Sequence, residues 1–233
     1  MRRKKVYHTD NGSENAFTVS ISDLMAGLLA IFILALSYFM LNLGEVTKQY
    51  TGNTEKRTEL LQDIQHEMET KGVKVTIDEK QGVLRIPESV LFSQGEAVVK
   101  PEGQWAVQSL SQSLYSILTQ EKYAESVETV FIEGHTDNVP IETAEFHSNW
   151  ELSTQRAINT WNLMRSSQGE LDTIHNANGQ PIFSCSGYAD TRPITDDIYD
   201  ENSNEGRQAN RRIDIRFAMM PPTEGGVERN ISK

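Results

Sequence analysis

The chain has 233 residues, a formal net charge of -11 at pH 7 and 37% hydrophobic residues. This length suits one globular domain with appendages, and the hydrophobic share is low for a protein that crosses a membrane many times. The acidic balance argues against a nucleic-acid partner, because nucleic-acid-binding domains are usually basic.

Cys185 is the only cysteine, which excludes an intrachain disulfide and a zinc site built from several cysteines. We expect it to be a small buried residue on a strand. An intermolecular disulfide is the alternative.

An apolar run follows the polar N-terminus. Asp23 is the only charged residue between Phe17 and Leu43, and the stretch from Leu24 to Gly44 has none. A spanning helix needs about 20 such residues. The apolar core of a cleaved signal peptide is shorter, about 7–15 residues, and a small-residue cleavage site follows it. The sequence therefore predicts a retained transmembrane helix at residues 17–43, after a tail at residues 1–16.

The orientation of this helix follows from the flanking charges. Arg2, Arg3, Lys4 and Lys5 precede the apolar run, whereas the charges after it are mixed and lie further away. By the positive-inside rule, the N-terminus lies in the cytoplasm and the bulk of the protein lies outside it.

Asp23 has two interpretations. It caps the helix at the membrane interface, or it lies inside the helix, because Phe17, Val19 and Ile21 extend the apolar character upstream. A carboxylate inside a membrane is costly and normally faces protein or water, where it has a functional role such as an ion relay. One helix cannot surround such a site, so this role requires partner helices.

Residues 44–72 form a polar connector. Gly44, Gly52 and Asn53 are expected to break its first part, and residues 55–71 then place apolar side chains on one helical face, with Gly72 as a stop. The apolar positions of this short amphipathic helix are Leu60, Leu61, Ile64 and Met68. The helix packs on the following domain, pairs with a second copy or lies on the membrane.

The rest of the chain alternates strand and helix patterns, which predicts an α+β domain at residues 73–220 with helices on one face of a mixed sheet. The expected strands lie at 73–77, 83–86, 127–133, 182–186 and 212–218, and the expected long helices begin at Pro101 and Asn149. A disordered tail at residues 221–233 is expected to follow.

Four polar segments stand out in this domain: Gly134–Pro140, Ser148–Ala157, Ser186–Ile194 and Asn204–Arg212. The first follows a strand and the second opens a helix, so a carboxylate, an arginine and free helix N–H groups converge at one rim. Such a site suits a zwitterion, with Asp137 for an ammonium and Arg156 for a carboxylate. A structural ion pair between these two residues is the alternative.

A metal hydrolase is the enzyme hypothesis that the sequence invites, through His135, Asp137 and His147. The spacing of His135 and Asp137 does not specify a metal site, and no nucleophile elbow or P-loop occurs. We therefore expect no catalytic residues, no metal site and no cofactor.

The four segments resemble the signature of the OmpA-like peptidoglycan-binding domain, over roughly Val73 to Met219. The resemblance implies a βαβαββ sandwich in which Asp137 and Arg156 hold the diaminopimelate of the stem peptide. It also implies pocket positions for four further residues: Thr136, Ser148, Asn149 and Leu152. Some relatives have an aromatic residue where this chain has Ser148. By the same resemblance, a basic segment orders the loop before the last strand, through Arg207, Arg211 and Arg212.

The segment Asn149-Trp150-Glu151-Leu152-Ser153, together with the Asp23 helix, resembles the MotB branch of ion-driven stators. This implies a single-pass protein of the bacterial inner membrane with a periplasmic domain. The resemblance also implies two partners, peptidoglycan and a MotA-like subunit, five copies of which form a ring around a dimer of this chain. In that arrangement Asp23 passes protons or sodium ions. The amino-acid sequence that follows Asp23 is similar to that of the MotB-like subunit of Zorya anti-phage systems. A flagellar stator and a wall anchor without ion flux remain the alternatives.

Overall fold

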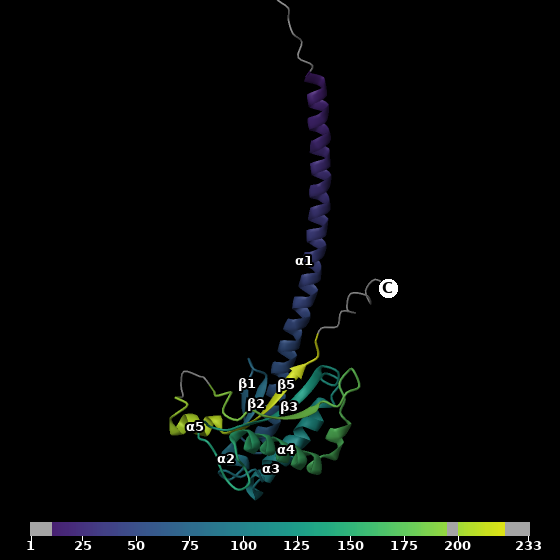
Figure 1. Cartoon of the computed structure of the whole chain (residues 1–233). Coiled ribbons are helices and arrows are strands. Elements are labelled where there is room, and N and C mark those ends of the chain that lie inside the picture. The colour runs from purple at the N-terminus through teal and green to yellow at the C-terminus, as the bar shows by residue number, and fades with distance from the viewer. Residues whose placement is uncertain (1–10, 195–199, 222–233) are drawn as a thin grey trace, which may run out of the picture. The chain divides into compact units, whose positions relative to one another are not determined.

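A computed structural model describes residues 11–194 and 200–221 of the chain (Figure 1). These residues fall into two compact units, which divide between Gln49 and Tyr50. The basic N-terminal cluster and all but the first residue of the expected C-terminal tail lie outside the described residues.

The first unit consists of the N-terminal part of helix α1 (Asn11–Thr70). Within it, Thr18–Gly44 is long and apolar enough to cross a membrane, with a mean hydropathy of 2.5 over its most apolar window and no buried residue there. The helix begins six residues before the expected start at residue 17. Asp23 therefore lies more than three turns inside α1 and is not its N-cap.

The expected breaks in the connector are absent, because Gly44, Gly52 and Asn53 all lie within α1. That prediction was wrong. A glycine in a helix interior costs only about 1 kcal/mol relative to alanine, which the hydrogen-bonded turns on either side can offset.

The second unit holds a five-stranded sheet in the order β1-β2-β5-β3-β4. Its strands are β1 (Thr76–Asp78), β2 (Val83–Pro87), β3 (Val127–His135), β4 (Phe183–Gly187) and β5 (Arg212–Met219). Only β3 and β4 pair in parallel; the other neighbouring strands pair antiparallel. The α+β class with a mixed sheet is thus confirmed, and β1 is an edge strand added in a hairpin before the expected βαβαββ succession.

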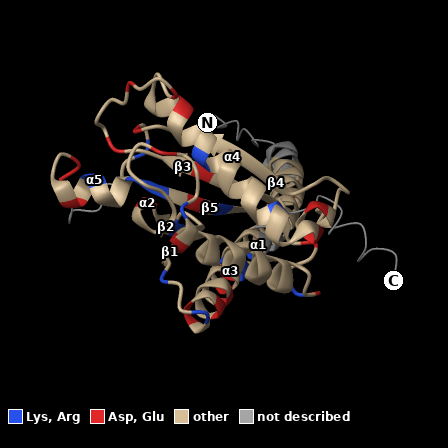
Figure 2. Ribbon diagram, turned by 90° about the horizontal axis from the view of Figure 1, so that it is seen from below, with Lys and Arg blue, Asp and Glu red and all other residues tan. Residues whose placement is uncertain are grey.

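Helices cover one face of this sheet (Figure 2). The long ones are α3 (Pro101–Leu118), α4 (Asn149–Ser167) and the part of α1 that begins at Tyr50. Three short ones accompany them: α2 (Glu88–Leu91), a 3-10 turn (Gly169–Thr173) and α5 (Asn204–Asn210). The sequence predicted the long helices, but not α2.

The amphipathic part of α1 is a component of the domain core. Leu60, Leu61, Ile64 and Met68 are fully buried in the same cluster as the strand and helix residues of the domain. Of the three roles left open for this segment, the structure shows packing on the following domain.

The two faces of the sheet differ in chemistry because side chains alternate along each strand. On β5, Ile213, Ile215 and Phe217 enter the hydrophobic core beneath the helices. The other face carries the alternate residues of β5, which form ion pairs: Arg212, Asp214 and Arg216. Cys185 lies on β4 as expected, half-buried against the core, and burial raises the pKa of its thiol to about 11.

Two glycines let α4 approach the sheet closely at the ends of β3 and β4. Gly134 and Gly187 are register partners. A Cβ on Gly134 would lie 2.0 Å from the carbonyl oxygen of Ser153, and a Cβ on Gly187 would lie 2.2 Å from Thr154 Oγ1. The first turns of α4 are thereby fixed beside the residues that follow β3.

We predict that Gly134→Ala lowers the free energy of unfolding by about 1–3 kcal/mol, because the added methyl meets backbone and not a flexible side chain. Thermal unfolding of the full chain in detergent measures this effect. Gly169→Ala is the matched control, since a Cβ there meets nothing within 4 Å. Equal melting temperatures for the two variants would contradict the prediction.

Candidate functional site

An open cavity of about 480 Å³ lies where the end of β3, the start of α4, α2 and the α5–β5 junction meet. Its lining contains five of the residues expected to bind peptidoglycan: Thr136, Asp137, Asn149, Leu152 and Arg156. Arg207 and Arg211 from the expected structural segment also line it. Ser148 and Arg212 do not.

The start of α4 aims its residues into this cavity. Ser148 is the N-cap, and its hydroxyl accepts a hydrogen bond from Glu151 N at 3.3 Å. The Glu151 carboxylate accepts in return from His147 N at 2.7 Å. Such reciprocal bonds satisfy the free N–H groups of a helix start. Ser148 therefore acts on the site through the position of the helix.

The loop after β3 is held by side-chain hydrogen bonds. The amide of Asn149 donates to the carbonyl oxygens of Asp137 at 3.3 Å and of Val139 at 3.0 Å. Asp137 Oδ1 accepts from Val139 N at 3.1 Å, which closes a turn of the kind that aspartate favours. Thr136 Oγ1 is buried without a hydrogen-bond partner among the described residues.

The charged residues of the cavity do not pair as the sequence suggested. Asp137 Oδ2 contacts Arg211 Nη1 at 2.5 Å, and Arg156 Nη2 donates to the carboxylate of Glu88. Glu88 also accepts from Arg211 Nε at 2.6 Å. The expected alternative of an Asp137–Arg156 pair is absent, because Glu88 and Arg211 lie between the two.

Burial and neighbouring charges shift the pKa values of Arg156 and Arg211 in opposite directions. Burial lowers the pKa of Arg156, although Glu88 opposes this effect. For Arg211 the hydrogen bond to Asp137 and the charge of Glu88 outweigh burial, so its pKa is raised. Both guanidinium groups remain charged at any physiological pH.

Glu88 is the residue of this site that the sequence analysis missed. It is 6% exposed, opens α2 and contacts two arginines that come from distant parts of the chain. The only sequence feature that could have pointed to Glu88 is its position directly after a strand that ends in Pro87. That pattern is too common to identify a buried acid.

The basic residues before the last strand divide between the cavity and the sheet. Arg212 lies on the polar face, where its Nε donates to Asp214 at 3.0 Å and its remaining nitrogens donate to the carbonyl oxygens of Asn210 and Arg192. This arrangement is consistent with an ordering role for Arg212. Arg207 and Arg211 instead present charge to the cavity.

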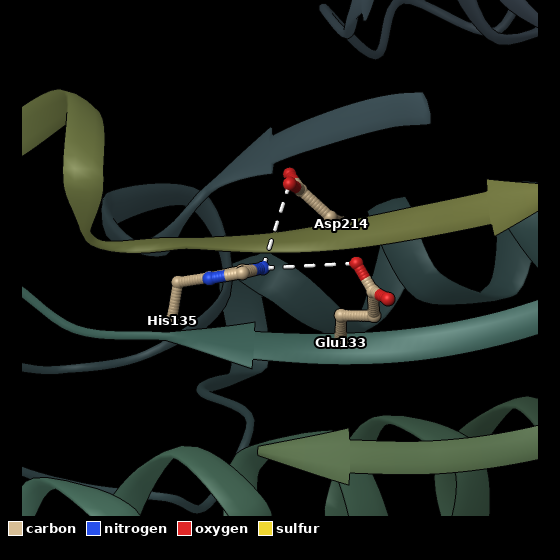
Figure 3. A group of neighbouring side chains, drawn as sticks. All are labelled: Glu133, His135 and Asp214. Carbon is tan, nitrogen blue, oxygen red and sulfur yellow. Dashed lines mark ion pairs between the residues drawn. The ribbon is translucent and has the colours of Figure 1, made fainter. Parts of the chain in front are cut away.

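A second cluster of titratable residues lies on the polar face of the sheet (Figure 3). His135 Nε2 is 3.5 Å from Asp214 Oδ2 and 3.9 Å from Glu133 Oε2, and none of the three residues is more than 1% exposed. The His135 ring stacks on Tyr188, with centroids 5.5 Å apart. Arg192 lies over the same tyrosine ring, at 3.6 Å.

The three side chains could offer a metal ion one ligand atom each, all within 4.8 Å of one another. However, the two carboxylates already pair with arginines. Arg216 donates to both oxygens of Glu133 at 2.8–3.0 Å, and Asp214 pairs with Arg212 and lies 3.8 Å from Arg85. These cations would repel a divalent ion. We therefore interpret the cluster as a buried ion network under the loop that follows β4.

This network shifts the pKa values of its members. Burial would raise the pKa of Glu133, but His135 and Arg216 outweigh it and lower the value to about 2. The pKa of His135 is lowered below 6.5, chiefly by burial, with Arg212 acting in the same direction and the two carboxylates opposing. His135 is therefore neutral in the folded protein near neutral pH.

Together, the structure describes an apolar helix of spanning length and an α+β domain whose charged cavity is large enough for a small zwitterionic ligand. The chain belongs to the OmpA family, described as such by the family match over residues 91–211.

Its relatives identify it further as a MotB-like protein with an OmpA-like domain. It is 30% identical to Motility protein B of Bacillus subtilis over 168 residues, which are 72% of this chain and 53% of that protein. The chain thus spans about half the length of that relative. It is 24% identical to Zorya protein ZorB of Escherichia coli over 220 residues, 86% of this chain and 88% of that protein.

A solved structure described as a putative MotB-like protein from Desulfovibrio vulgaris has the same fold. It superposes with a TM-score of 0.55 at 22% identity, over 73% of this chain and 98% of that chain. None of these three proteins is named as an enzyme.

We predict that the free energy of unfolding decreases as the pH falls from about 7 to about 5, in part because of His135. Below pH 6.5 the unfolded chain takes up a proton that the buried ring of the folded chain disfavours. Thermal unfolding of the full chain in detergent across this range measures the slope.

His135→Asn should flatten this pH dependence, whereas His175→Asn should leave it unchanged because the side chain of His175 is exposed. The same slope in wild type and His135→Asn would contradict the assignment.

Proposed function

We propose that the chain is the wall-binding subunit of an ion-driven, stator-like complex of the bacterial inner membrane. The observation that carries the proposal is the cavity, which gathers five residues expected to bind peptidoglycan from the loop after β3 and from α4. Its mixture of opposite charges suits a ligand that carries both an ammonium and a carboxylate. The stem peptide of peptidoglycan offers such groups in diaminopimelate.

The membrane part of the proposal rests on Asp23 within α1. It lies five residues after the start of the apolar span, about 8 Å along the helix axis. Helical spacing places small residues on the same face one or two turns away: Ser20, Ala26, Gly27 and Ala30. Small residues let partner helices approach closely in a membrane. This supports a dimer of the chain inside a MotA-like ring of five copies, with Asp23 as the ion-carrying residue.

In this arrangement the N-terminus is cytoplasmic and the domain from Val73 onward is periplasmic. The chain does no catalysis and needs no metal or cofactor of its own. Ion flow past Asp23, of protons or sodium ions, turns the ring while the domain holds the complex to the wall.

We propose anti-phage defence of the Zorya type as the biological role. The match to ZorB extends over 86% of this chain and 88% of that protein. The sequence that follows Asp23 also resembles the MotB-like subunits of Zorya systems. A flagellar stator is the second candidate, supported by the higher identity to Motility protein B. Protection of cells against phage plating separates the two from restored swimming in a strain that lacks its own motility protein.

Asp137→Ala and Arg156→Ala should each abolish sedimentation of the full chain with purified peptidoglycan sacculi. The first removes the more exposed of the two carboxylates that line the cavity, and the second leaves the buried Glu88 without its Arg156 partner. Arg165→Ala is the matched control, because Arg165 pairs with Asp172 on the surface and does not line the cavity. Undiminished binding by both cavity variants would overturn the wall-binding proposal.

Asp23→Asn should abolish phage protection, or swimming if the role is flagellar, while membrane insertion and co-purification with the ring partner persist. Asparagine keeps the size of the side chain but carries no titratable charge. Ser22→Ala serves as the control on the neighbouring position. An Asp23→Asn protein with full activity would show that this carboxylate carries no ions.

A further inference from the structure

The loop that follows β4 covers the buried ion network, and we call residues Tyr188–Ile194 the covering loop. The Tyr188 ring stacks on His135, with the centroids 5.5 Å apart and the ring planes inclined by 18°. The Arg192 guanidinium lies 3.6 Å from the centre of the same tyrosine ring, and its side chain is 49% exposed. Tyr188 and Arg192 thus shield the buried histidine from solvent.

His135 is buried, and neither of its ring nitrogens has a hydrogen-bond partner among the described residues. Its Nε2 lies 3.5 Å from Asp214 Oδ2 and 3.9 Å from Glu133 Oε2 (Figure 3). Both carboxylates instead accept hydrogen bonds from arginines: Arg212 donates to Asp214, and Arg216 donates to Glu133. The neutral ring therefore occupies a charged site without taking part in its charge pairing.

A proton on His135 would add positive charge to a site that already holds more arginines than carboxylates. The charged and titratable groups around the ring come from the strands and the loop packed about it: Glu133 from β3, Arg212, Asp214 and Arg216 from β5, Arg85 of β2 with its partner Asp78 of β1, and Tyr188 and Arg192 from the covering loop. Burial and Arg212 lower the pKa of His135, and the two nearest carboxylates oppose them. A protonated ring is therefore more stable in contact with water than under the covering loop.

The covering loop also holds the rim of the cavity through Ala189. The carbonyl oxygen of Ala189 accepts from Thr136 N at 2.9 Å, and its N–H donates to Ser153 Oγ at 3.1 Å. Thr136 lines the cavity, and Ser153 follows the lining residue Leu152 on α4. The φ of Ala189 is 49°, a left-handed conformation that costs energy and persists only where its surroundings hold it. Opening of the loop would relieve this strain and release both sides of the rim.

The two ends of the covering loop are anchored more firmly than its middle. At one end Tyr188 N donates to the carbonyl oxygen of Gly134 at 2.9 Å, and at the other Ile194 N donates to Asn210 Oδ1 at 2.7 Å. Between the ends, residues 189–193 can move if few contacts break: the two hydrogen bonds of Ala189, the contacts of the Arg192 side chain, and the bond from Arg212 to the Arg192 carbonyl oxygen. Such a local opening costs less than unfolding of the domain.

We propose that protonation of His135 opens the covering loop and thereby loosens the cavity, so that the domain holds peptidoglycan less tightly in acid than at neutral pH. His135 is then a switch residue that acts on the cavity through Tyr188 and Ala189 and does not touch the ligand. The binding part of this inference rests on the proposed function, whereas the opening of the loop does not.

The sign and the limit of the effect follow from proton linkage. A solvated imidazole takes up a proton below about pH 6.5, whereas the ring under the closed loop resists it, so acid favours the open form. Between about pH 7 and about pH 5 the opening equilibrium rises by at most about 25-fold, the limit for a closed form that takes up no proton. The ammonium and carboxylate groups of the proposed ligand stay charged over this range.

Hydrogen–deuterium exchange of the full chain in detergent measures the opening directly. After correction for the intrinsic exchange rate, residues 189–193 should exchange severalfold faster at about pH 5 than at about pH 7. Residues 169–173, in the 3-10 turn outside the network, should show a smaller change. In His135→Asn the difference between the two segments should disappear, because the ring that takes up the proton is absent. His175→Asn should respond as wild type does, since the side chain of His175 is exposed.

Arg192→Gln tests the covering loop without altering the histidine. The variant loses the cation over Tyr188 and the 3.7 Å contact with Glu133, so residues 189–193 should exchange faster already at neutral pH. Because His135 is still present, a further increase in acid should remain. Exchange in Arg192→Gln that equals wild type at both pH values would show that this stack does not hold the loop.

Sedimentation with purified sacculi at the two pH values measures the coupling to the cavity. Wild type and His175→Asn should lose affinity severalfold in acid, whereas the ratio of affinities at the two pH values should be close to one for His135→Asn. Comparing ratios within each variant removes any constant effect of the substitution on binding.

Three outcomes would contradict parts of this inference separately. The same acid response of exchange in wild type and His135→Asn overturns the switch. Faster exchange in acid with unchanged binding of sacculi overturns the coupling to the cavity alone. Wild type that binds sacculi at neither pH overturns the proposed function and the coupling with it, while the exchange of residues 189–193 still decides whether His135 opens the loop.

Discussion

The buried positive charge of Arg156 constrains the arrangement of the whole cavity, because only 1% of this residue is exposed. A buried cation requires anions and hydrogen-bond acceptors close by. Here they come from Glu88 and the carbonyl oxygen of Glu96, on the segment between β2 and α3. The second oxygen of Glu88 then binds Arg211. One buried charge thus links α4, α2 and the start of β5, and the three segments reach the cavity together.

The cavity and the buried ion network on the polar face share one strand and one loop. Alternation along β3 places Glu133 and His135 in the network, and Asp137 follows in the cavity. Ala189 follows the tyrosine that stacks on His135. Its carbonyl oxygen accepts from Thr136 N at 2.9 Å, and its N–H donates to Ser153 Oγ at 3.1 Å. Its φ of 49° lies in the left-handed region that side chains disfavour. This strained residue is held by both β3 and α4, so the loop over the network also fixes the rim of the cavity.

The sequence was informative where a pattern is local and less so where a contact joins distant segments. Helical spacing predicted the buried face of Leu60 and Ile64, and strand alternation predicted β5. The polar segments after β3 and at the start of α4 predicted that Asp137 and Arg156 would reach one cavity. Their actual partners could not be predicted, because Glu88–Arg156 and Asp137–Arg211 join residues 68 and 74 positions apart. The local signals also failed once. The glycines in α1 predicted breaks in the connector, but the helix continues through them because propagation of an existing helix is favourable.

The packing of α1 into the domain limits how far the proposed wall-binding cavity can lie from a membrane. The apolar span ends at Gly44 and the first fully buried core residue of α1 is Leu60, so only sixteen positions separate them. They measure about 24 Å as a helix, and about 55 Å fully extended. Because Leu60, Leu61, Ile64 and Met68 belong to the core, a longer reach would require pulling this helix out of the domain and exposing that apolar surface. If Thr18–Gly44 spans the inner membrane, the domain can reach the wall only across this short connector.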